Sequence, residues 1–123
     1  MKHIYTKISG TPYAKDKPRG RKNAPKEWTD EIIRQTKELL PIREACILRV
    51  TFLLPPDKFP ADFPYGPDLD NLLKRFLDAL NETIFKDTQG GDSSIVSLHV
   101  MKTRVESPNE AGAILEVLPV TIT

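Results

Sequence analysis

Alternation of apolar and polar residues predicts four β-strands in this chain, because successive side chains of a strand point to opposite faces of a sheet. The clearest stretch has an apolar residue at every second position from Cys46 to Leu54, with Arg49 and Thr51 between them. The predicted strands span residues 4–8, 45–54, 95–103 and 112–118. The turn-forming sequence Ser107-Pro108-Asn109 separates the last two, and we expect those two strands to form a hairpin.

Two other stretches repeat their apolar residues at the spacing of an amphipathic α-helix. The first covers roughly residues 26–40, where Pro25 suits the first turn and Pro41 ends the helix. The second covers about residues 69–81. The order β-α-β-α-β-β indicates an α/β or α+β domain with two main helices on a mixed sheet of about four strands. Strands separated by a helix could pair in parallel.

Composition narrows the class of protein without identifying it. With 123 residues, the chain is long enough to close one core, so we expect residues 1–123 to form a single domain. The only cysteine, Cys46, cannot form an internal disulfide, and no apolar run approaches the roughly 20 residues that cross a membrane. The N-terminal residues lack the apolar core of a signal peptide. We therefore expect a cytoplasmic protein with no membrane partner.

Two acidic residues, Asp68 and Asp70, stand at the start of the second predicted helix. The ordinary explanation is capping, because carboxylates at a helix N-terminus accept hydrogen bonds from free N–H groups and complement the macrodipole. A second explanation is a metal site. Asp92, in the loop before a later strand, could return to this helix end, and three converging carboxylates are tolerated best with a bound cation. Ligands that are all oxygen favour Mg²⁺ or Mn²⁺ over zinc.

Lys74 adds a positive charge to the same helix face, four residues after Asp70. In phosphodiester hydrolysis, a metal could activate water while such a lysine orients the phosphate or stabilises its developing charge. Lys74 could instead be only a salt-bridge partner of Asp70. Residue types alone leave both interpretations open.

The segment around these residues resembles the RusA-type Holliday junction resolvases of bacteria and their prophages. The family shows a Pro-Asp-x-Asp-Asn-x-x-Lys pattern followed by Asp-Ala-Leu, which is present here from Pro67 to Lys74 and from Asp78 to Leu80. The segment from Asp92 to Lys102 is similar to a family segment with an acidic residue, a strand and a lysine at its end. A weaker match is Gly10-Thr11-Pro12 with the basic residues after it. The three matches follow the family's order and span nearly the whole chain.

The resemblance implies a homodimeric, metal-dependent endonuclease that cuts four-way DNA junctions by paired phosphodiester hydrolysis in recombination and repair. It implies Mg²⁺ or Mn²⁺ and no small-molecule cofactor. By position, Asp68, Asp70 and Asp92 would bind the metal, and Lys74 would assist catalysis. A dimer has a physical reason, since two active sites can make paired nicks across a junction. An alternative of another class is a branched-DNA-binding protein of the same fold whose catalysis is impaired.

The third carboxylate is where the chain departs from the family pattern. The family usually carries an Asp-Asp pair before the third strand, whereas here Gly91 precedes Asp92 in a longer loop. We prefer Asp92 as the third ligand, because its distance to Ile95 and Lys102 fits the strand that follows. Asp87 is the alternative third ligand.

Positive charge is concentrated before the first predicted helix, although the formal net charge is only +1. The candidate DNA-binding residues of this basic loop are Lys15, Lys17, Arg19, Arg21 and Lys22, followed by Lys26. Such a run is often only a solvated loop, but next to a site that must meet a polyanion we favour contact with the DNA backbone. These contacts would give salt-dependent affinity rather than base readout. Lys102 and Arg104 are weaker candidates for the same role.

Overall fold

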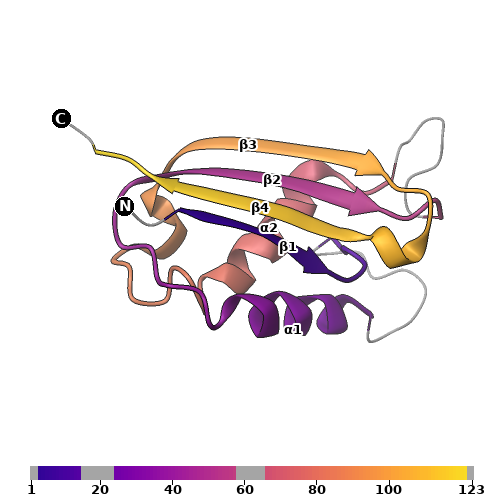
Figure 1. Cartoon of the computed structure of the whole chain (residues 1–123), viewed down its shortest axis with the longest axis horizontal. Helices are drawn as coiled ribbons and strands as arrows, with labels where there is room; N and C mark the ends of the chain where they lie inside the picture. Colours follow the sequence, from indigo (N-terminus) through magenta and orange to yellow (C-terminus); the bar gives the residue numbers. More distant parts are fainter. Residues whose placement is uncertain (1–2, 15–23, 58–65, 122–123) are drawn as a thin grey trace.

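A computed structural model describes residues 3–14, 24–57 and 66–121, and it confirms the predicted fold class and element order (Figure 1). The elements are β1 (Ile4–Ser9), α1 (Ala24–Thr36), β2 (Cys46–Leu54), α2 (Leu69–Leu80), β3 (Ile95–Arg104) and β4 (Gly112–Pro119). Two short 3₁₀ turns, Gly91–Ser94 and Pro108–Glu110, precede β3 and β4. No helix within these ranges is long and apolar enough to cross a membrane.

The four strands form one mixed sheet in the order β1-β4-β2-β3. β2 and β3 pair in parallel, as the intervening helix suggested, while β4 runs antiparallel to both β1 and β2. The predicted hairpin between β3 and β4 is wrong, because β2 lies between them. Every second side chain of β2 is fully buried, five in all, so β2 is stable only in the interior of the sheet. Burial of β2 therefore decides the strand order, although the connection from β3 to β4 is short enough for a hairpin.

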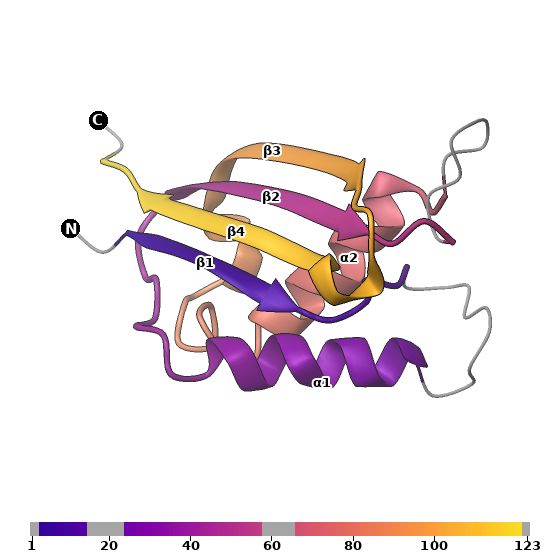
Figure 2. The same ribbon diagram turned by 45° about the vertical axis from the view of Figure 1, so that its right-hand side comes forward.

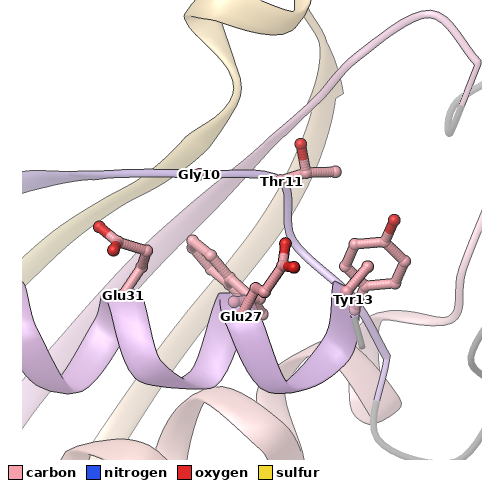
Figure 3. A pocket seen from close by; sticks show the side chains of 7 residues that line it. Gly10, Thr11, Tyr13, Glu27 and Glu31 are labelled. Carbon is pink, nitrogen blue, oxygen red and sulfur yellow. The ribbon is translucent and has the colours of Figure 1, made fainter. Parts of the chain in front are cut away.

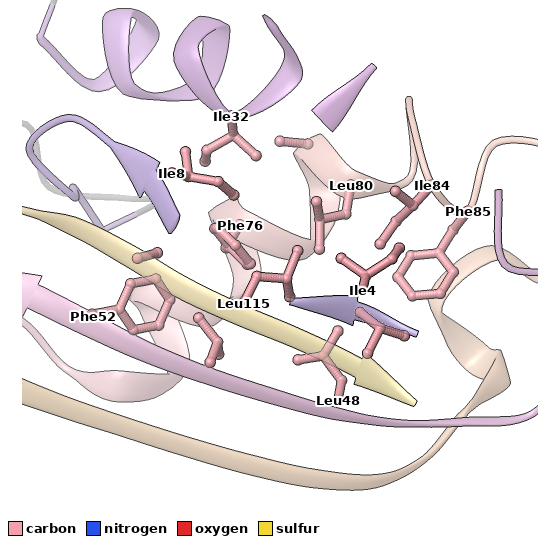
Figure 4. Packing of buried hydrophobic residues seen from close by; sticks show 14 of the residues in the cluster. Ile4, Ile8, Ile32, Leu48, Phe52, Phe76, Leu80, Ile84, Phe85 and Leu115 are labelled. Atoms are coloured by element: carbon pink, nitrogen blue, oxygen red, sulfur yellow. The ribbon is translucent and has the colours of Figure 1, made fainter. Parts of the chain in front are cut away.

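Both helices cover the same face of the sheet, and the core lies between the two layers (Figures 1 and 2). Phe76 of α2 is the residue that joins three elements (Figure 4). Its ring stacks on Trp28 of α1 with centroids 6.3 Å apart, and it meets Phe52 of β2 edge-on at 5.5 Å. All three side chains are at most 2% exposed. Trp28 is thus a packing residue of the core.

The first helix ends at Thr36, four residues before the predicted end. The buried hydroxyl of Thr36 donates to the carbonyl of Ile32 at 2.7 Å and lies 2.8 Å from the Thr83 hydroxyl. Leu40, the last residue of the predicted helix, is 63% exposed. The apolar pattern therefore extends past the helix, and Thr36 contributes a buried polar contact at its end.

The second helix runs antiparallel to β2 and β3, so its two ends lie at opposite ends of the sheet (Figure 2). At its start, the Lys102 ammonium near the end of β3 donates to the carbonyl of Pro67 at 2.7 Å. At its end, Asn81 donates to Asp92, which precedes β3, at 3.0 Å. These two contacts place Lys102 at the start of α2 and Asp92 at its end.

Replacing Phe76 with alanine should lower the free energy of unfolding by about 3–5 kcal/mol, because it leaves a cavity between both helices and the sheet. Urea unfolding followed by circular dichroism measures this change. Leu77→Ala is the control, since Leu77 is only partly buried at the edge of the core and should cost less. A cost of under about 1 kcal/mol for Phe76→Ala would contradict the central position given to this ring.

Candidate active site

Asp68 occupies the N-cap position of α2, with an extended backbone at φ −67° and ψ 141°. Its carbonyl accepts the first helical hydrogen bond from Leu72 at 3.0 Å, but its carboxylate makes no capping bond with the described residues. Asp70 accepts one hydrogen bond, from the Asn71 N–H at 3.0 Å. Both aspartates are exposed. The capping explanation therefore fails for Asp68, and both residues present carboxylate oxygens to solvent.

Lys74 lies one turn beyond Asp70 and is also exposed. The alternative role predicted for it was an ion pair with Asp70. No such ion pair joins the two side chains in the part of the chain that the structure describes. The ammonium group of Lys74 is therefore not neutralised by its acidic neighbour on the helix.

Lys102 fixes the approach to the two aspartates. Its register partner on β2 is Phe52, which is fully buried, so Lys102 projects from the sheet face that the helices cover. Its hydrogen bond to the Pro67 carbonyl is short and charge-assisted, which makes it stronger than a neutral one. Lys102 is thus a support for the start of α2, and DNA contact by this residue stays a prediction.

The predicted convergence of Asp68, Asp70 and Asp92 within one copy of the chain is wrong. Asn81, the C-cap of α2, donates to the Asp92 carboxylate at 3.0 Å. Asn81 follows Asp70 by 11 residues, about 16 Å along the axis of α2, so most of the helix separates Asp92 from the other two carboxylates. Among the described residues, no group of three His, Cys, Asp or Glu side chains is placed to hold a metal ion.

The physical reason is the parallel pairing of β2 with β3. A parallel partner begins at the same end of the sheet as the strand it pairs with, so the residues before β3 return to the start of β2. The alternative ligand Asp87 lies there as well, 3.5 Å from the guanidinium of Arg43, which precedes β2. Neither candidate for the third carboxylate reaches the start of α2 in its own copy.

Sequence reasoning missed Asn81, whose side chain orients Asp92. The only available signal was its place directly after the apolar repeat of α2. Asn81 also explains why Gly91 departs from the family's acidic pair. Gly91 has a left-handed φ of +56°, and a Cβ there would lie 2.9 Å from the Asn81 Oδ1 atom.

The basic residues Lys15, Lys17, Arg19, Arg21 and Lys22 lie outside the described residues. The residues on either side of them are described. The carbonyls of Ala14 and Pro25 both accept hydrogen bonds from Arg75 of α2, at 3.2 Å each. The described residues on either side of the basic segment are therefore bonded to the helix that carries Asp68, Asp70 and Lys74.

A pocket of about 170 Å³ lies between α1 and the chain that leaves β1 (Figure 3). Glu27 and Glu31 contribute carboxylates to its lining. Hydrogen bonds from Arg34 and then Gln35 lower the pKa of Glu31, so this group stays ionised at neutral pH. Glu31 is already paired with Arg34, and no lysine or arginine is among the described residues that line this pocket, so the pocket is a poorer candidate for the DNA-cutting site than the start of α2.

A family model described as Endodeoxyribonuclease RusA matches residues 9–111. The chain belongs to the RusA family. The matched range covers the acidic start of α2, Asp92, Lys102 and the basic segment. The RusA family is one of endodeoxyribonucleases, which are hydrolases that cut within a DNA strand. No curated protein matches the chain.

Lys102→Met should lower the free energy of unfolding by about 1–2 kcal/mol, because it removes a charge-assisted hydrogen bond at a partly buried carbonyl. Chemical denaturation measures the loss. Lys86→Met is the matched control, since Lys86 is exposed and lies in the turn after α2. Equal stability of the two variants would show that the bond from Lys102 to Pro67 contributes nothing to the fold.

Proposed function

We propose that this RusA-family chain is a metal-dependent endonuclease that resolves four-way DNA junctions by paired phosphodiester hydrolysis, in DNA recombination and repair. The observation that supports this most is at the start of α2. Asp68 and Asp70 are exposed, Asp68 has no capping role among the described residues, and Lys74 follows without an ion pair to Asp70. Exposed charges of both signs on one helix turn suit the binding of a cation and a phosphate together.

The donor set at this helix start fits Mg²⁺ or Mn²⁺. Carboxylate oxygens are the ligands that these hard cations prefer. The Asp68 carboxylate has no hydrogen bond to a described residue that metal binding would break. When bound, such a cation offsets the negative charge of the phosphodiester and activates water for hydrolysis. We propose Asp68, Asp70 and Asp92 as its ligands.

Lys74 would hold the scissile phosphate beside these carboxylates. A lysine ammonium is a compact point charge with three donors, so it can follow a phosphate oxygen as charge builds up during hydrolysis. Its exposure leaves it accessible to DNA that approaches the start of α2. Lys102, through its hydrogen bond to the Pro67 carbonyl, would keep Pro67 and hence Asp68 in place.

Asp92 would reach this site from a second copy of the chain, joined at the edge of the sheet. β3 is an edge strand ten residues long, and in the described chain it pairs only with β2. It exposes Val96, Leu98 and Met101 by 54%, 45% and 58%. A long apolar edge is prone to pair with another strand unless something covers it.

Two-fold symmetry would bring the required carboxylate to the right place. Two copies of β3 related by a two-fold axis pair antiparallel, so the start of each lies beside the end of the other. Asp92 precedes the start of β3, and Lys102 near its end contacts Pro67. Both contacts are on the helix side of the sheet. Asp92 of one copy would therefore approach Asp68 and Asp70 of the other.

The opposite edge of the sheet supports this function less well. β1 has only six residues. A dimer paired through β1 would leave Asp92 of each copy far from Asp68 and Asp70 of both copies. The β3 edge therefore accounts for both a homodimer and a complete metal site. We further propose that Lys15, Lys17, Arg19, Arg21 and Lys22 contact junction phosphates, with a salt-dependent affinity.

A labelled four-way junction should be cut in symmetric positions when Mg²⁺ or Mn²⁺ is present and left intact in chelator. Asp70→Asn should reduce the cleavage rate by about 10³-fold or more, since it removes a charged ligand, while junction binding is kept. Gel assays of cleavage and of binding measure both effects. Asp30→Asn, a change of the same type on the exposed side of α1, is the control that should cut normally.

Binding of the junction without metal-dependent cutting by the wild type would instead support the alternative, a branched-DNA-binding protein with impaired catalysis. The Gly91 substitution and the distant Asp92 are the observations that favour it. Absence of binding even at low salt would contradict both functions.

A mixture of Asp70→Asn and Asp92→Asn chains, refolded together, should recover cleavage that neither variant has alone. About half of the dimers would be mixed, and one of their two sites would be intact, so nicking should return to about a quarter of the wild-type rate. The intact site joins Asp70 of one copy to Asp92 of the other. Mixtures that stay inactive would place Asp92 outside the second copy's site, and full activity of Asp92→Asn alone would remove it as a ligand.

A further inference from the structure

The side chain of Asn81 lies between the end of α2 and the turn that carries Asp92. Its Nδ2 group donates to Asp92 Oδ2 at 3.0 Å in a partly buried contact. Its Oδ1 atom is buried and has no hydrogen-bond partner in the part of the chain that the structure describes. A buried acceptor without a partner lowers stability, and the helix end is held by the backbone N–H of Asn81, which donates to the Leu77 carbonyl at 2.9 Å. Folding alone therefore does not explain the asparagine at this position.

The backbone of Gly91 makes room for this amide. A Cβ atom on residue 91 would lie 2.9 Å from Asn81 Oδ1 and 3.4 Å from its Cγ, and the first distance is shorter than Cβ atoms approach in proteins. Gly91 also has a left-handed φ of +56°, which glycine adopts at no steric cost. The amide of Asn81 therefore packs against the Cα atom of Gly91, and a side chain there would displace it from Asp92.

Asn81 leaves the other carboxylate oxygen of Asp92 available. Asp92 Oδ1 accepts no hydrogen bond from a described residue. The backbone of Asp92 belongs to the 3₁₀ turn Gly91–Ser94, which is closed by a hydrogen bond from the Ile95 N–H to the Asp92 carbonyl. With its backbone in a turn and Oδ2 on Asn81, the side chain has few conformations left to lose when Oδ1 binds a cation. Such partners of a ligating carboxylate raise metal affinity.

We infer that Asn81 is a positioning residue, which holds Asp92 in the orientation that binds the metal ion of the second copy. The inference rests on the proposed function, in which Asp92 of one copy completes the site of the other. Asn81 shares its helix with Asp70, but its contact is with Asp92 of the same copy. Asn81 therefore acts in the active site to which its own Asp70 does not belong, and it acts only through Asp92.

Asn81→Leu removes the donor and the unpartnered acceptor at similar side-chain size. Its melting temperature should stay within about 3 °C of the wild type, since the backbone bonds at the helix end are kept. Its affinity for Mn²⁺ without DNA, measured by electron paramagnetic resonance, should fall about 10–100-fold. A loss of metal affinity without a loss of stability is the result expected of a positioning residue, whereas an unchanged affinity would overturn the inference.

Gly91→Ala tests the same contact from the other side. The added Cβ should move the amide away from Asp92 and lower the Mn²⁺ affinity about tenfold or more. Gly90→Ala is the matched control, because Gly90 also has a left-handed φ, of +80°, but a Cβ there meets the hydroxyl of Ser93 and not Asn81. The control should change the affinity less than about twofold. Equal losses in both variants would assign the effect to backbone strain and would count against the inference.

Mixed dimers show in which active site Asn81 acts. Asn81→Leu chains refolded with Asp70→Asn chains should recover cleavage to about a quarter of the wild-type rate, because the Asp92 that meets an intact Asp70 has its own Asn81. Asn81→Leu with Asp92→Asn should give no more cleavage than Asn81→Leu alone, since no site then has a positioned Asp92. The reverse pattern would show that Asn81 acts along α2 on its own Asp68 and Asp70, and would overturn the inference.

Nuclear magnetic resonance of the metal-free protein separates this inference from the proposed function. Asp92→Asn should shift the side-chain amide resonances of Asn81, because the charged acceptor is lost. Asp87→Asn, which removes an ion pair to Arg43, is the control that should leave these resonances in place. Unchanged Asn81 resonances in Asp92→Asn would overturn the inference whatever the activity of the protein. A wild type that binds no Mn²⁺ would overturn the proposed function, while the resonances would still decide whether Asn81 holds Asp92.

Discussion

The parallel pairing of β2 with β3 is the constraint on which the rest of this structure depends. Parallel strands begin at the same end of a sheet, so the chain must travel back along α2 before β3 can start. This return places Asp92 at the C-terminal end of α2 and Lys102 at its N-terminal end. β3 also lies at an edge of the sheet, where β2 is its only neighbour among the described strands.

A divided site follows from that topology. The carboxylates that the family pattern groups together lie at the two ends of one helix, and each end is held by its own hydrogen bond to the residues around β3. A single copy therefore does not bring the three carboxylates together. In the proposed dimer the divided site would become a complete site, because the antiparallel pairing of two β3 strands would reverse one copy relative to the other. A nuclease that needs two cuts across a junction would then be unable to assemble one site without the other.

Much of the fold could be predicted from the sequence, because period-two and period-3.6 patterns are strong in this chain. The buried alternation from Cys46 to Leu54 and the apolar stripe of α2 located both elements within about one residue. The patterns could not predict which strands are neighbours, and the expected hairpin of β3 and β4 failed for that reason. Local periodicity shows which side chains of a strand are buried. The order of the strands depends on contacts between elements that are distant in the sequence.

The candidate site was predictable in part. The motif from Pro67 to Lys74 lies where its sequence indicated, at the exposed start of α2. The position of Asp92 was not predictable, since a loop residue can approach either end of a helix and only the strand pairing decides which. Asn81 and Arg75 were missed because their roles depend on contacts between residues that are 11 to 61 positions apart in the chain.

The most direct test of this account is a crystal structure of the protein with Mn²⁺, located by its anomalous scattering. One ion is expected at each start of α2, bonded to Asp68 and Asp70 of one copy and to Asp92 of a second copy paired through β3. An ion bonded to Asp92 together with carboxylates of the same copy would contradict it, as would an ion at Asp68 and Asp70 without Asp92 of a second copy.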